Sequence, residues 1–317
     1  MRAIDRLTFV IPVFNEGDNI PSLYNEYKDL WISYDAGVLF VNDGSADNTL
    51  EEIQLLNSQD ERVGYISLSR NFGKEQSLAA GFSIVPDNHT IMVIDGDGQH
   101  TAEATEKLLQ AYCSQNEYEI IFGVRDSRAY QSMIDRAFSK AFYKVLNSLS
   151  ENEVNSRHGD FFVASPKVLY EFKKLKDSKL FWKGIYSWVG FKKADVAIDI
   201  ADRVSGKSKF NFKAKLSLAF NSILWTSFVP LHLITYLGLT IFMFSALFGV
   251  YLVLEFLFKG VTTPGYYTLA LIQTMLGGII LLSLGVIARY LALVIDNTST
   301  KSPYIIDSNQ VLPSTFK

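Results

Sequence analysis

The most informative stretch of the sequence is Ile91-Met92-Val93-Ile94-Asp95-Gly96-Asp97-Gly98-Gln99-His100. Its apolar beginning is typical of a strand that is buried on both faces. Because side chains alternate along a strand, we expect Asp95 and Asp97 to point the same way at its carboxyl end. Two such carboxylates are suitable ligands for a divalent cation that bridges a diphosphate. An acidic turn that closes a strand has the same pattern, so the rest of the chain must decide between the two interpretations.

Apolar runs alternate with helical patterns through most of the chain. Besides the strand that begins at residue 91, we predict strands at residues 7–13, 38–41, 63–68, 120–124, 159–163 and 195–200. The predicted helices cover residues 19–34, 47–57, a run ending at 84, 101–116, 133–149, a run from 166, and 180–189. This alternation predicts the α/β class, with a Rossmann-like, doubly wound parallel sheet.

Polar residues collect where the predicted strands end. Ligands of open α/β sheets bind in the crevice at that edge. Asp43, after the second strand, is a candidate for hydrogen bonding a nucleoside, and Arg70 and Lys74 add positive charge near the same crevice. Arginine and lysine are well suited to binding phosphate, although each taken singly is more often a solvated surface charge. The further candidates for binding a phosphate are Arg125, Arg136, Arg203, Lys207 and Lys209.

Two more polar residues leave alternatives open. Asp160 starts a short predicted strand, where it is either a base or orienting group beside the reacting carbon or an Asp that binds local backbone. His100 follows the acidic pair closely enough to be a metal ligand, and an ordinary loop histidine is the alternative. If the acceptor is a phosphate, it is already anionic at pH 7, so Asp160 has little deprotonation to perform.

The composition divides the chain into a soluble part and a membrane part. Hydrophobic residues make up 48% of the 317 residues and charged residues 20%, and the apolar residues crowd into the last third. The net charge of −3 gives no general attraction to nucleic acid. Cys113 is the only cysteine, so no intramolecular disulfide can form. Asp5 and Arg6 interrupt the N-terminus, which therefore does not resemble a signal peptide.

Two uncharged runs, residues 233–254 and 261–288, are each long enough to cross a bilayer. Residues 212–228 are basic and then aromatic, which is typical of a helix in the membrane interface. We therefore expect an α/β domain at 1–205, a basic loop with interfacial helices at 206–230, and a two-helix transmembrane hairpin with a tail at 231–317. A helical hairpin buried in a large soluble protein is the alternative.

The positive-inside rule predicts that both termini lie in the cytoplasm, because the turn between the runs supplies only Lys259. The basic residues on the other side are Lys207, Lys209, Lys213, Lys215, Arg289 and Lys301.

Five motifs along the chain resemble, in order, the signatures of family 2 glycosyltransferases with a GT-A fold. They are Pro12-Val13-Phe14-Asn15-Glu16, Asn42-Asp43-Gly44-Ser45, Arg70-Asn71-Phe72-Gly73-Lys74-Glu75, Asp95-Gly96-Asp97-Gly98-Gln99 and Gly159-Asp160-Phe161. Within that family the chain is most similar to polyprenyl-phosphate glycosyltransferases, in particular the bactoprenol glucosyltransferases of O-antigen serotype conversion. That similarity includes residues 180–190, the loop at 207–210, and Pro303-Tyr304-Ile305-Ile306.

The resemblance implies an inverting transfer of a single hexose, glucose, from a UDP-sugar to undecaprenyl phosphate, with Mg2+ or Mn2+ as cofactor. It implies catalytic roles for Asp97 and Asp160, and metal binding by Asp95 and Asp97, with His100 as a further candidate. The residues matched to donor-nucleotide binding are Pro12, Glu16, Asp43, Arg70, Lys74 and Asp95. Those matched to the acceptor phosphate are Arg125 and Arg136, beside the basic residues Arg203, Lys207 and Lys209.

The resemblance also implies a setting. The protein is expected to be a multi-pass protein of the bacterial inner membrane with its catalytic domain in the cytoplasm, and to form a homo-oligomer, a tetramer in some members. The pathway of such an enzyme requires a flippase and a downstream glycosyltransferase that modifies O-antigen or another surface glycan.

The chain departs from its family at Phe162-Val163, where relatives have Arg-Leu, and at His100-Thr101-Ala102, where they have Asp-Pro-Pro. A third departure is the segment 287–292 after the second apolar run. The departures leave open another donor (galactose, GlcNAc or GDP-mannose) and a non-catalytic scaffold that binds a nucleotide sugar. A processive polysaccharide synthase is disfavoured, because no Trp of the chain follows a Gln-x-x-Arg pattern.

Overall fold

The structure is a computed structural model, and it describes residues 3–125, 155, 157–175, 181–198, 302–307 and 310–316, with single residues and short pieces between 240 and 294. The predicted helix at 133–149 with Arg136, the basic residues Arg203, Lys207 and Lys209, and the predicted interfacial helix lie outside the described residues. So does nearly all of the first predicted membrane run. Within the described part of the chain, no helix is both long and apolar enough to span a membrane.

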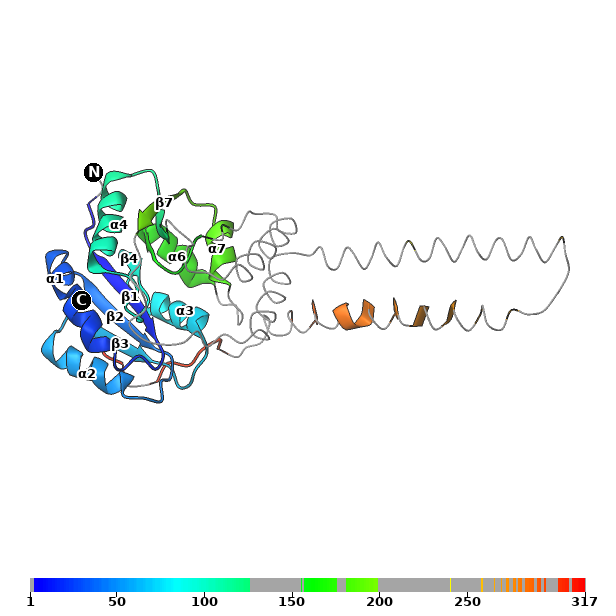
Figure 1. The fold of residues 1–317 in the computed structure, drawn as a ribbon, viewed down its shortest axis with the longest axis horizontal. Coiled ribbons are helices and arrows are strands. Elements are labelled where there is room, and N and C mark those ends of the chain that lie inside the picture. Colours follow the sequence, from blue (N-terminus) through cyan, green and yellow to red (C-terminus); the bar gives the residue numbers. More distant parts are fainter. Residues whose placement is uncertain are drawn as a thin grey trace.

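The described strands and helices follow the predicted order (Figure 1). The strands are β1 (Leu7–Val13), β2 (Gly37–Asn42), β3 (Val63–Ser67), β4 (Thr90–Val93), β5 (Ile120–Arg125), β6 (Phe162–Ala164) and β7 (Lys193–Ile198). The helices are α1 (Ile20–Ser33), α2 (Thr49–Gln59), α3 (Lys74–Ile84), α4 (Ala102–Ser114), α6 (Pro166–Lys174) and α7 (Trp182–Trp188), and a short 3-10 helix, η1 (Ser314–Phe316), follows near the C-terminus. The prediction of an α/β domain is confirmed.

The sheet is mixed, so the prediction of a parallel sheet was wrong at one strand. Its order is β3-β2-β1-β4-β6-β5-β7, and β6 runs antiparallel to both β4 and β5, whereas the other pairs are parallel. A strand's direction depends on the edge at which the chain enters it. Residues 157–161 enter β6 from the edge where β4 and β5 end, so Asp160 lies at that edge although it precedes its strand.

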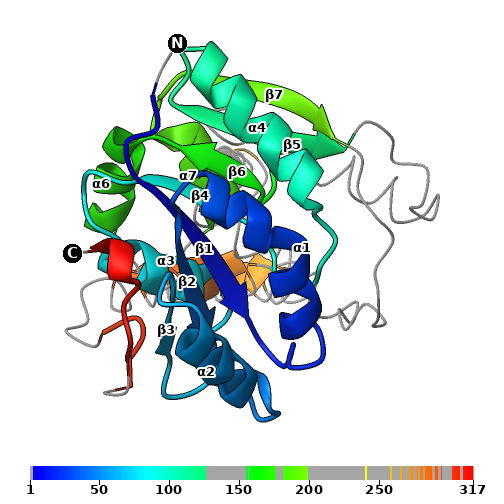
Figure 2. The same ribbon diagram turned by 90° about the vertical axis from the view of Figure 1, so that its left-hand side faces the viewer.

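Helices cover both faces of the sheet, and the alternation along β1 shows how. Phe9 and Ile11 belong to one core, with α1, α2 and α4, while Val10 belongs to the other, with α3, α6 and α7. Figure 2 shows these two layers in front of and behind the sheet. Every residue of β1 is buried, as expected for a strand covered on both faces. Replacing Phe9 by Ala would cost about 3–5 kcal/mol, because it would leave a cavity in the first core.

The residue at the N-cap position of α1 does not cap the helix as its type predicts. Asn19 makes no side-chain capping bond, and its amide instead donates to Glu16 at 2.5 Å. At α4 the expected capping does occur, since the hydroxyl of Thr101 accepts the backbone N–H of Ala104 at 3.2 Å. The side chain of Asn19 therefore helps to hold the loop after β1 rather than the helix.

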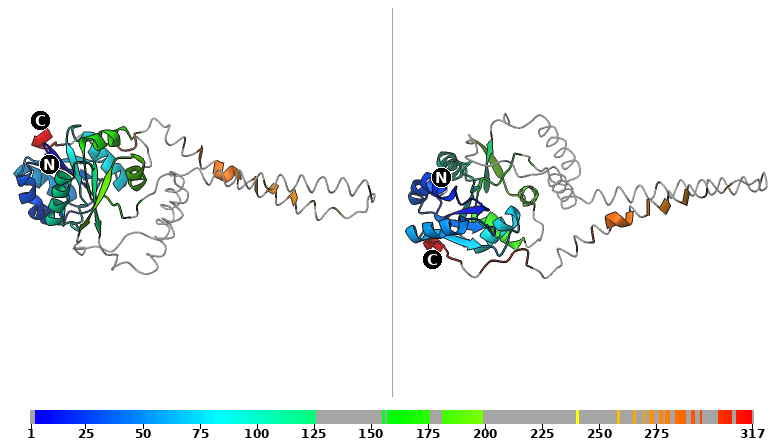
Figure 3. Two further views of the ribbon diagram at one scale, coloured as in Figure 1. Left: turned by 90° about the horizontal axis from the view of Figure 1, so that it is seen from above. Right: turned by 60° about the horizontal axis from the view of Figure 1, so that its bottom comes forward.

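The C-terminal tail returns to the α/β domain and runs along the edge of β3. Tyr65 and Val311 exchange backbone hydrogen bonds of 2.7 and 3.0 Å, and Ile305 accepts the N–H of Ser69 at 3.0 Å. Figure 3 shows this tail beside the domain in both views. Pro313 fills the space beside Gly64, where a Cβ would lie 2.4 Å from Pro313 Cδ. The tail thus pairs an edge strand whose backbone groups would otherwise be open to solvent.

Candidate functional site

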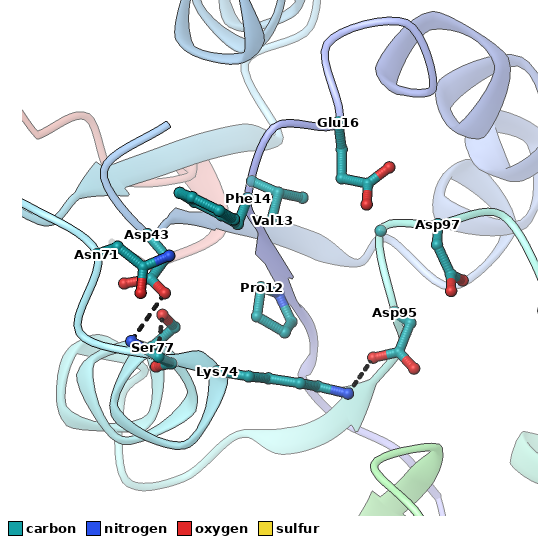
Figure 4. A pocket seen from close by; sticks show the side chains of 12 residues that line it. Pro12, Val13, Phe14, Glu16, Asp43, Asn71, Lys74, Ser77, Asp95 and Asp97 are labelled. Atoms are coloured by element: carbon teal, nitrogen blue, oxygen red, sulfur yellow. Dashed lines mark hydrogen bonds and ion pairs between the residues drawn. The ribbon is translucent and has the colours of Figure 1, made fainter. Parts of the chain in front are cut away.

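A pocket of about 390 Å3 opens where β1, β2 and β4 end and α3 begins (Figure 4). Because β2 and β4 lie on opposite sides of β1, the pocket stands where the strand order reverses, which is the usual ligand site of such sheets. The lining residues are Pro12, Val13, Phe14, Glu16, Asp43, Asn71, Gly73, Lys74, Ser77, Asp95, Gly96 and Asp97. The structure thus brings together the predicted residues Pro12, Glu16, Asp43, Lys74, Asp95 and Asp97.

Asp43 lies in this pocket and organises the loop before α3. Its two carboxylate oxygens accept the backbone N–H groups of Phe72 and Gly73 at 2.8 and 2.9 Å, and the Ser77 hydroxyl also donates to it. Burial raises the pKa of Asp43, and these donors partly offset the rise. Gly44 allows the close approach, because its φ is +63° and a Cβ there would lie 2.4 Å from the backbone of Arg70.

Asp95 and Asp97 line the pocket together, but strand alternation does not place them. The strand β4 ends at Val93, and both carboxylates lie in the turn that follows it. Gly98 has a φ of +71° in this turn, and Asp97 accepts hydrogen bonds from the backbone and side-chain nitrogens of Gln99. Strand alternation is therefore not the reason that Asp95 and Asp97 lie in one pocket. The segment after β4 brings the two carboxylates together.

Lys74 joins two carboxylates that are far apart in the sequence. Its ammonium lies 2.5 Å from Asp95 Oδ1 and 2.8 Å from Asp160 Oδ2. Figure 4 shows its side chain extended across the pocket floor toward Asp95. Burial on its own would lower the pKa of Lys74, but the charges of Asp160 and Asp95 outweigh it and raise the pKa. Lys74 is therefore a permanent cation between the two acids.

Asp160 receives a second donor from α7. The Tyr186 hydroxyl donates to Asp160 Oδ1 at 3.1 Å, so each carboxylate oxygen has one partner. Burial raises the pKa of Asp160, but the Lys74 ammonium, the charge of Lys183 and the Tyr186 hydroxyl together lower it by more, and the net pKa is below its usual value. Asp160 is consequently ionised at neutral pH.

Glu75, the residue after Lys74, ties α3 to α7. Its side chain accepts the backbone N–H of Trp182 at 3.2 Å, and its backbone carbonyl accepts the indole N–H of the same residue at 2.9 Å. Burial raises the pKa of Glu75 to about 7, and the charge of Asp160 adds to the rise. Sequence analysis missed Glu75, because a single acid at a helix start carries no signal of its tertiary partners.

His100 lies near the acidic turn. Its ring stacks on Phe161 with centroids 3.9 Å apart, and its Nε2 is 4.0 Å from Asp95 Oδ2. It is not among the residues that line the pocket, so metal ligation by His100 stays a prediction.

The basic residues predicted to bind phosphate are only partly described. The Arg70 guanidinium lies 4.0 Å from the centre of the Phe72 ring, and Arg70 does not line the pocket. Arg125 is the last residue of β5. Acceptor binding by Arg125, Arg136 and the basic loop therefore stays a prediction.

Asp95 and Asp97 are the candidate ligands for a divalent metal ion in the pocket. Among residues 3–125, 155, 157–175 and the other described parts, no three Asp, Glu, His or Cys side chains gather into a metal-binding cluster. Asp95 and Asp97 nonetheless fit Mg2+ or Mn2+, because such ions in nucleotide sites are held by one or two carboxylates together with substrate phosphates.

Sequence analysis also missed Asn71, Ser77 and Tyr186. Ser77 stands one helical turn after Lys74, so its position on the pocket side was accessible from helix periodicity. Tyr186 carried no such signal, because its contact with Asp160 depends on how α7 packs on the sheet.

A family model and full-length relatives both identify glycosyltransferases as the proteins to which this chain is similar. The model for glycosyl transferase family 2 matches residues 8–176. The chain is 33% identical over 308 residues to the bactoprenol glucosyl transferase of Shigella phage SfV, covering 96% of this chain and 99% of that protein. It is 32% identical over 317 residues to the putative glycosyltransferase CsbB of Bacillus subtilis, covering 98% and 94%.

Among solved structures, the glucosyl-3-phosphoglycerate synthase of Mycobacterium tuberculosis with bound phosphoglyceric acid aligns with a TM-score of 0.51. The alignment covers 70% of this chain and 79% of that one at 14% identity. The same enzyme with Mn2+, UDP and phosphoglyceric acid aligns with a TM-score of 0.50 at 13% identity, covering 69% and 76%. At these identities the likeness shows a shared fold, the GT-A-like α/β domain.

Proposed function

This chain belongs to glycosyl transferase family 2, and we propose that it transfers a single glucose from UDP-glucose to undecaprenyl phosphate at the cytoplasmic face of a bacterial inner membrane. The observation that carries the proposal is the near full-length similarity to bactoprenol glucosyl transferases, at 33% identity over 96% of the chain. The family accounts for the glycosyl transfer, and the sugar and the acceptor are the proposed part.

The pocket chemistry supports a nucleotide-diphosphate donor. Lys74 can place a positive charge against the diphosphate, and Asp43 holds the loop 71–73 that forms one wall. Asp95 and Asp97 supply the oxygen ligands for Mg2+ or Mn2+, and the M. tuberculosis enzyme of similar fold was solved with Mn2+ and UDP. When bound, such an ion neutralises charge that develops on the departing diphosphate.

In the proposed reaction, one oxygen of the acceptor phosphate forms a bond to the anomeric carbon as the bond from that carbon to the diphosphate breaks. The electron pair leaves with UDP, and attack from the opposite face inverts the configuration. No proton has to be removed, because the phosphate is already an anion at pH 7. Asp160 does not line the pocket itself, but it is ionised and contacts the pocket residue Lys74 at 2.8 Å. From that position it can orient the sugar and stabilise positive charge on the reacting carbon.

The proposal also covers the membrane location of the protein, its acceptor site and its partners. It includes the two membrane-spanning runs at 233–254 and 261–288, acceptor-phosphate binding by Arg125, Arg136, Arg203, Lys207 and Lys209, a homo-oligomer, and a flippase and second glycosyltransferase acting later. Leu284 and Ile287, two described residues of the second run, are helical, and their apolar side chains are 55% and 49% exposed. Exposed apolar side chains on such a helix are compatible with contact to lipid.

The test is turnover by the purified full chain in detergent. We expect UDP release when UDP-glucose, Mg2+ and undecaprenyl phosphate are supplied together, and none when any one is left out. UDP-galactose, UDP-GlcNAc and GDP-mannose in the same assay decide the sugar. Tight donor binding by calorimetry without turnover of any of them would show a non-catalytic binding protein and contradict the proposal.

Asp97→Asn is expected to abolish turnover, because the neutral amide weakens metal binding while it keeps the shape of the side chain. Asp29→Asn is the matched control, since Asp29 is an exposed acid on α1 outside the pocket. Equal activity of the two variants would remove Asp97 from the proposed machinery.

A further inference from the structure

Tyr186 is a polar side chain held almost entirely by aromatic rings. It is fully buried, and its ring lies 5.3, 5.0, 6.0 and 6.0 Å from the rings of Phe122, Phe162, Phe172 and Trp182. Packing on four rings leaves the side chain few alternative rotamers. The packing of these rings therefore fixes the position of the Tyr186 hydroxyl.

That position is beside Asp160. The Tyr186 hydroxyl donates to one carboxylate oxygen at 3.1 Å, and the Lys74 ammonium contacts the other at 2.8 Å. Burial raises the pKa of Tyr186 well above its usual value, and the charge of Asp160 adds to this, so the hydroxyl stays protonated and remains a donor. Within the described part of the chain, Glu75 and Lys183 also act electrostatically on Asp160.

We propose that Tyr186 is a positioning residue, whose hydroxyl works with Lys74 to hold Asp160 as an oriented anion rather than a proton acceptor. The inference rests on the proposed glycosyl transfer, in which the acceptor phosphate has no proton to give up. A carboxylate with a donor on each oxygen is stabilised in its ionised form and resists protonation. The two donors also fix the plane of the carboxylate beside the sugar, which a flexible acid would lose.

The experiment compares Tyr186→Phe, Asp160→Asn and the double variant in the full chain, with radiolabelled UDP-glucose and undecaprenyl phosphate under single-turnover conditions. Tyr24→Phe is the matched control, because its hydroxyl also donates to a carboxylate, Asp60, at 3.2 Å but on residues outside the pocket. Because Tyr186→Phe removes a hydrogen bond to a charged group, it should lower the rate roughly ten- to hundred-fold. The KM for UDP-glucose should stay the same, since Tyr186 does not line the pocket.

The double variant separates positioning from general structural support. If Tyr186 acts only through Asp160, adding Tyr186→Phe to Asp160→Asn should cost little more than Asp160→Asn alone. The acid limb of the rate profile should also move to higher pH in Tyr186→Phe, because the carboxylate loses a donor that favours ionisation.

Three results would overturn the inference: additive losses in the double variant, a loss no larger than that of Tyr24→Phe, or a faster reaction in Tyr186→Phe. The last result is what a base would show after losing a hydrogen bond that lowers its basicity. Absence of turnover by the unchanged protein would instead overturn the proposed function, and this inference with it.

Discussion

Glu75 gives the sharpest test of the charge arrangement, because its raised pKa makes the stability of the fold depend on pH. Its carboxyl has a pKa of about 7 against an ordinary value of 4.5, first because of burial and then because of the charge of Asp160. Trp182, Lys74 and Lys183 pull the pKa the other way without reversing it. The folded state therefore keeps a proton on Glu75 at pH values where the unfolded chain has lost it.

The sign follows from this difference. The contribution of Glu75 to the free energy of unfolding is fully present below pH 4.5 and is lost as the pH rises to about 7. Above that pH, Glu75 adds no further change. Each pKa unit corresponds to about 1.4 kcal/mol, so the loss is at most about 3 kcal/mol. For a domain of this size that loss corresponds to a fall of roughly 6–12 °C in Tm.

The assay is thermal unfolding of the full chain in detergent at several pH values from 4.5 to 8. Relative to the unchanged protein, Glu75→Gln should gain Tm as the pH rises from 4.5 to 7, because the amide keeps an acceptor for the Trp182 N–H but does not ionise. The difference between the two proteins is the readout, because buried His89 contributes an opposite slope between pH 4 and 6.5 in both. Glu171→Gln is the control, since that acid pairs with Lys174 on the solvent-facing side of α6 and its loss should leave the pH dependence unchanged. A slope in Glu75→Gln as steep as in the unchanged protein would refute the reasoning.

Three further outcomes are expected. Gly64→Val should lower Tm by displacing the tail, because its Cβ would lie 2.4 Å from Pro313, and Pro313→Ala in the same chain should restore part of the loss; no change in Tm would contradict the tail contact. His89→Gln should reduce the fall in the free energy of unfolding between pH 6.5 and 4, because burial lowers the pKa of His89 to about 4 and folding becomes less favourable as the unfolded chain takes up a proton there. The same fall in both proteins, measured by urea unfolding, would contradict this. Gly44→Ala should weaken UDP binding in calorimetry, since a Cβ would push on the loop at Arg70, and equal affinity would show that the loop has room.

Much of the fold was accessible from local patterns. The largely apolar runs at 7–13 and 120–124 were predicted as strands because a strand buried on both faces needs nearly continuous apolar sequence, and the structure confirms both. The polar residues after these strands were correctly expected to share one edge, since the carboxyl ends of parallel strands meet there. Hence Asp43, Asp95 and Asp97 line one pocket.

The direction of β6 was not accessible in the same way. The three apolar residues Phe162–Ala164 give no sign of the direction in which the strand runs. The direction of β6 is decided by the route that the chain takes into the sheet. That route brings Asp160 to the edge of the sheet where β4 ends and within reach of the pocket residue Lys74.

Residue type and spacing thus determined the elements, the core-facing positions and most of the pocket wall, because those depend on neighbours within a few turns or one strand. Packing of the layers decided which charges meet. Tyr186 contacts Asp160 across 26 residues of sequence and Trp182 contacts Glu75 across 107, and contacts at such separations depend on how α7 and α3 lie on the sheet. The ionised state of Asp160 and the raised pKa of Glu75 follow from those contacts, since burial and neighbouring charge are properties of the folded chain.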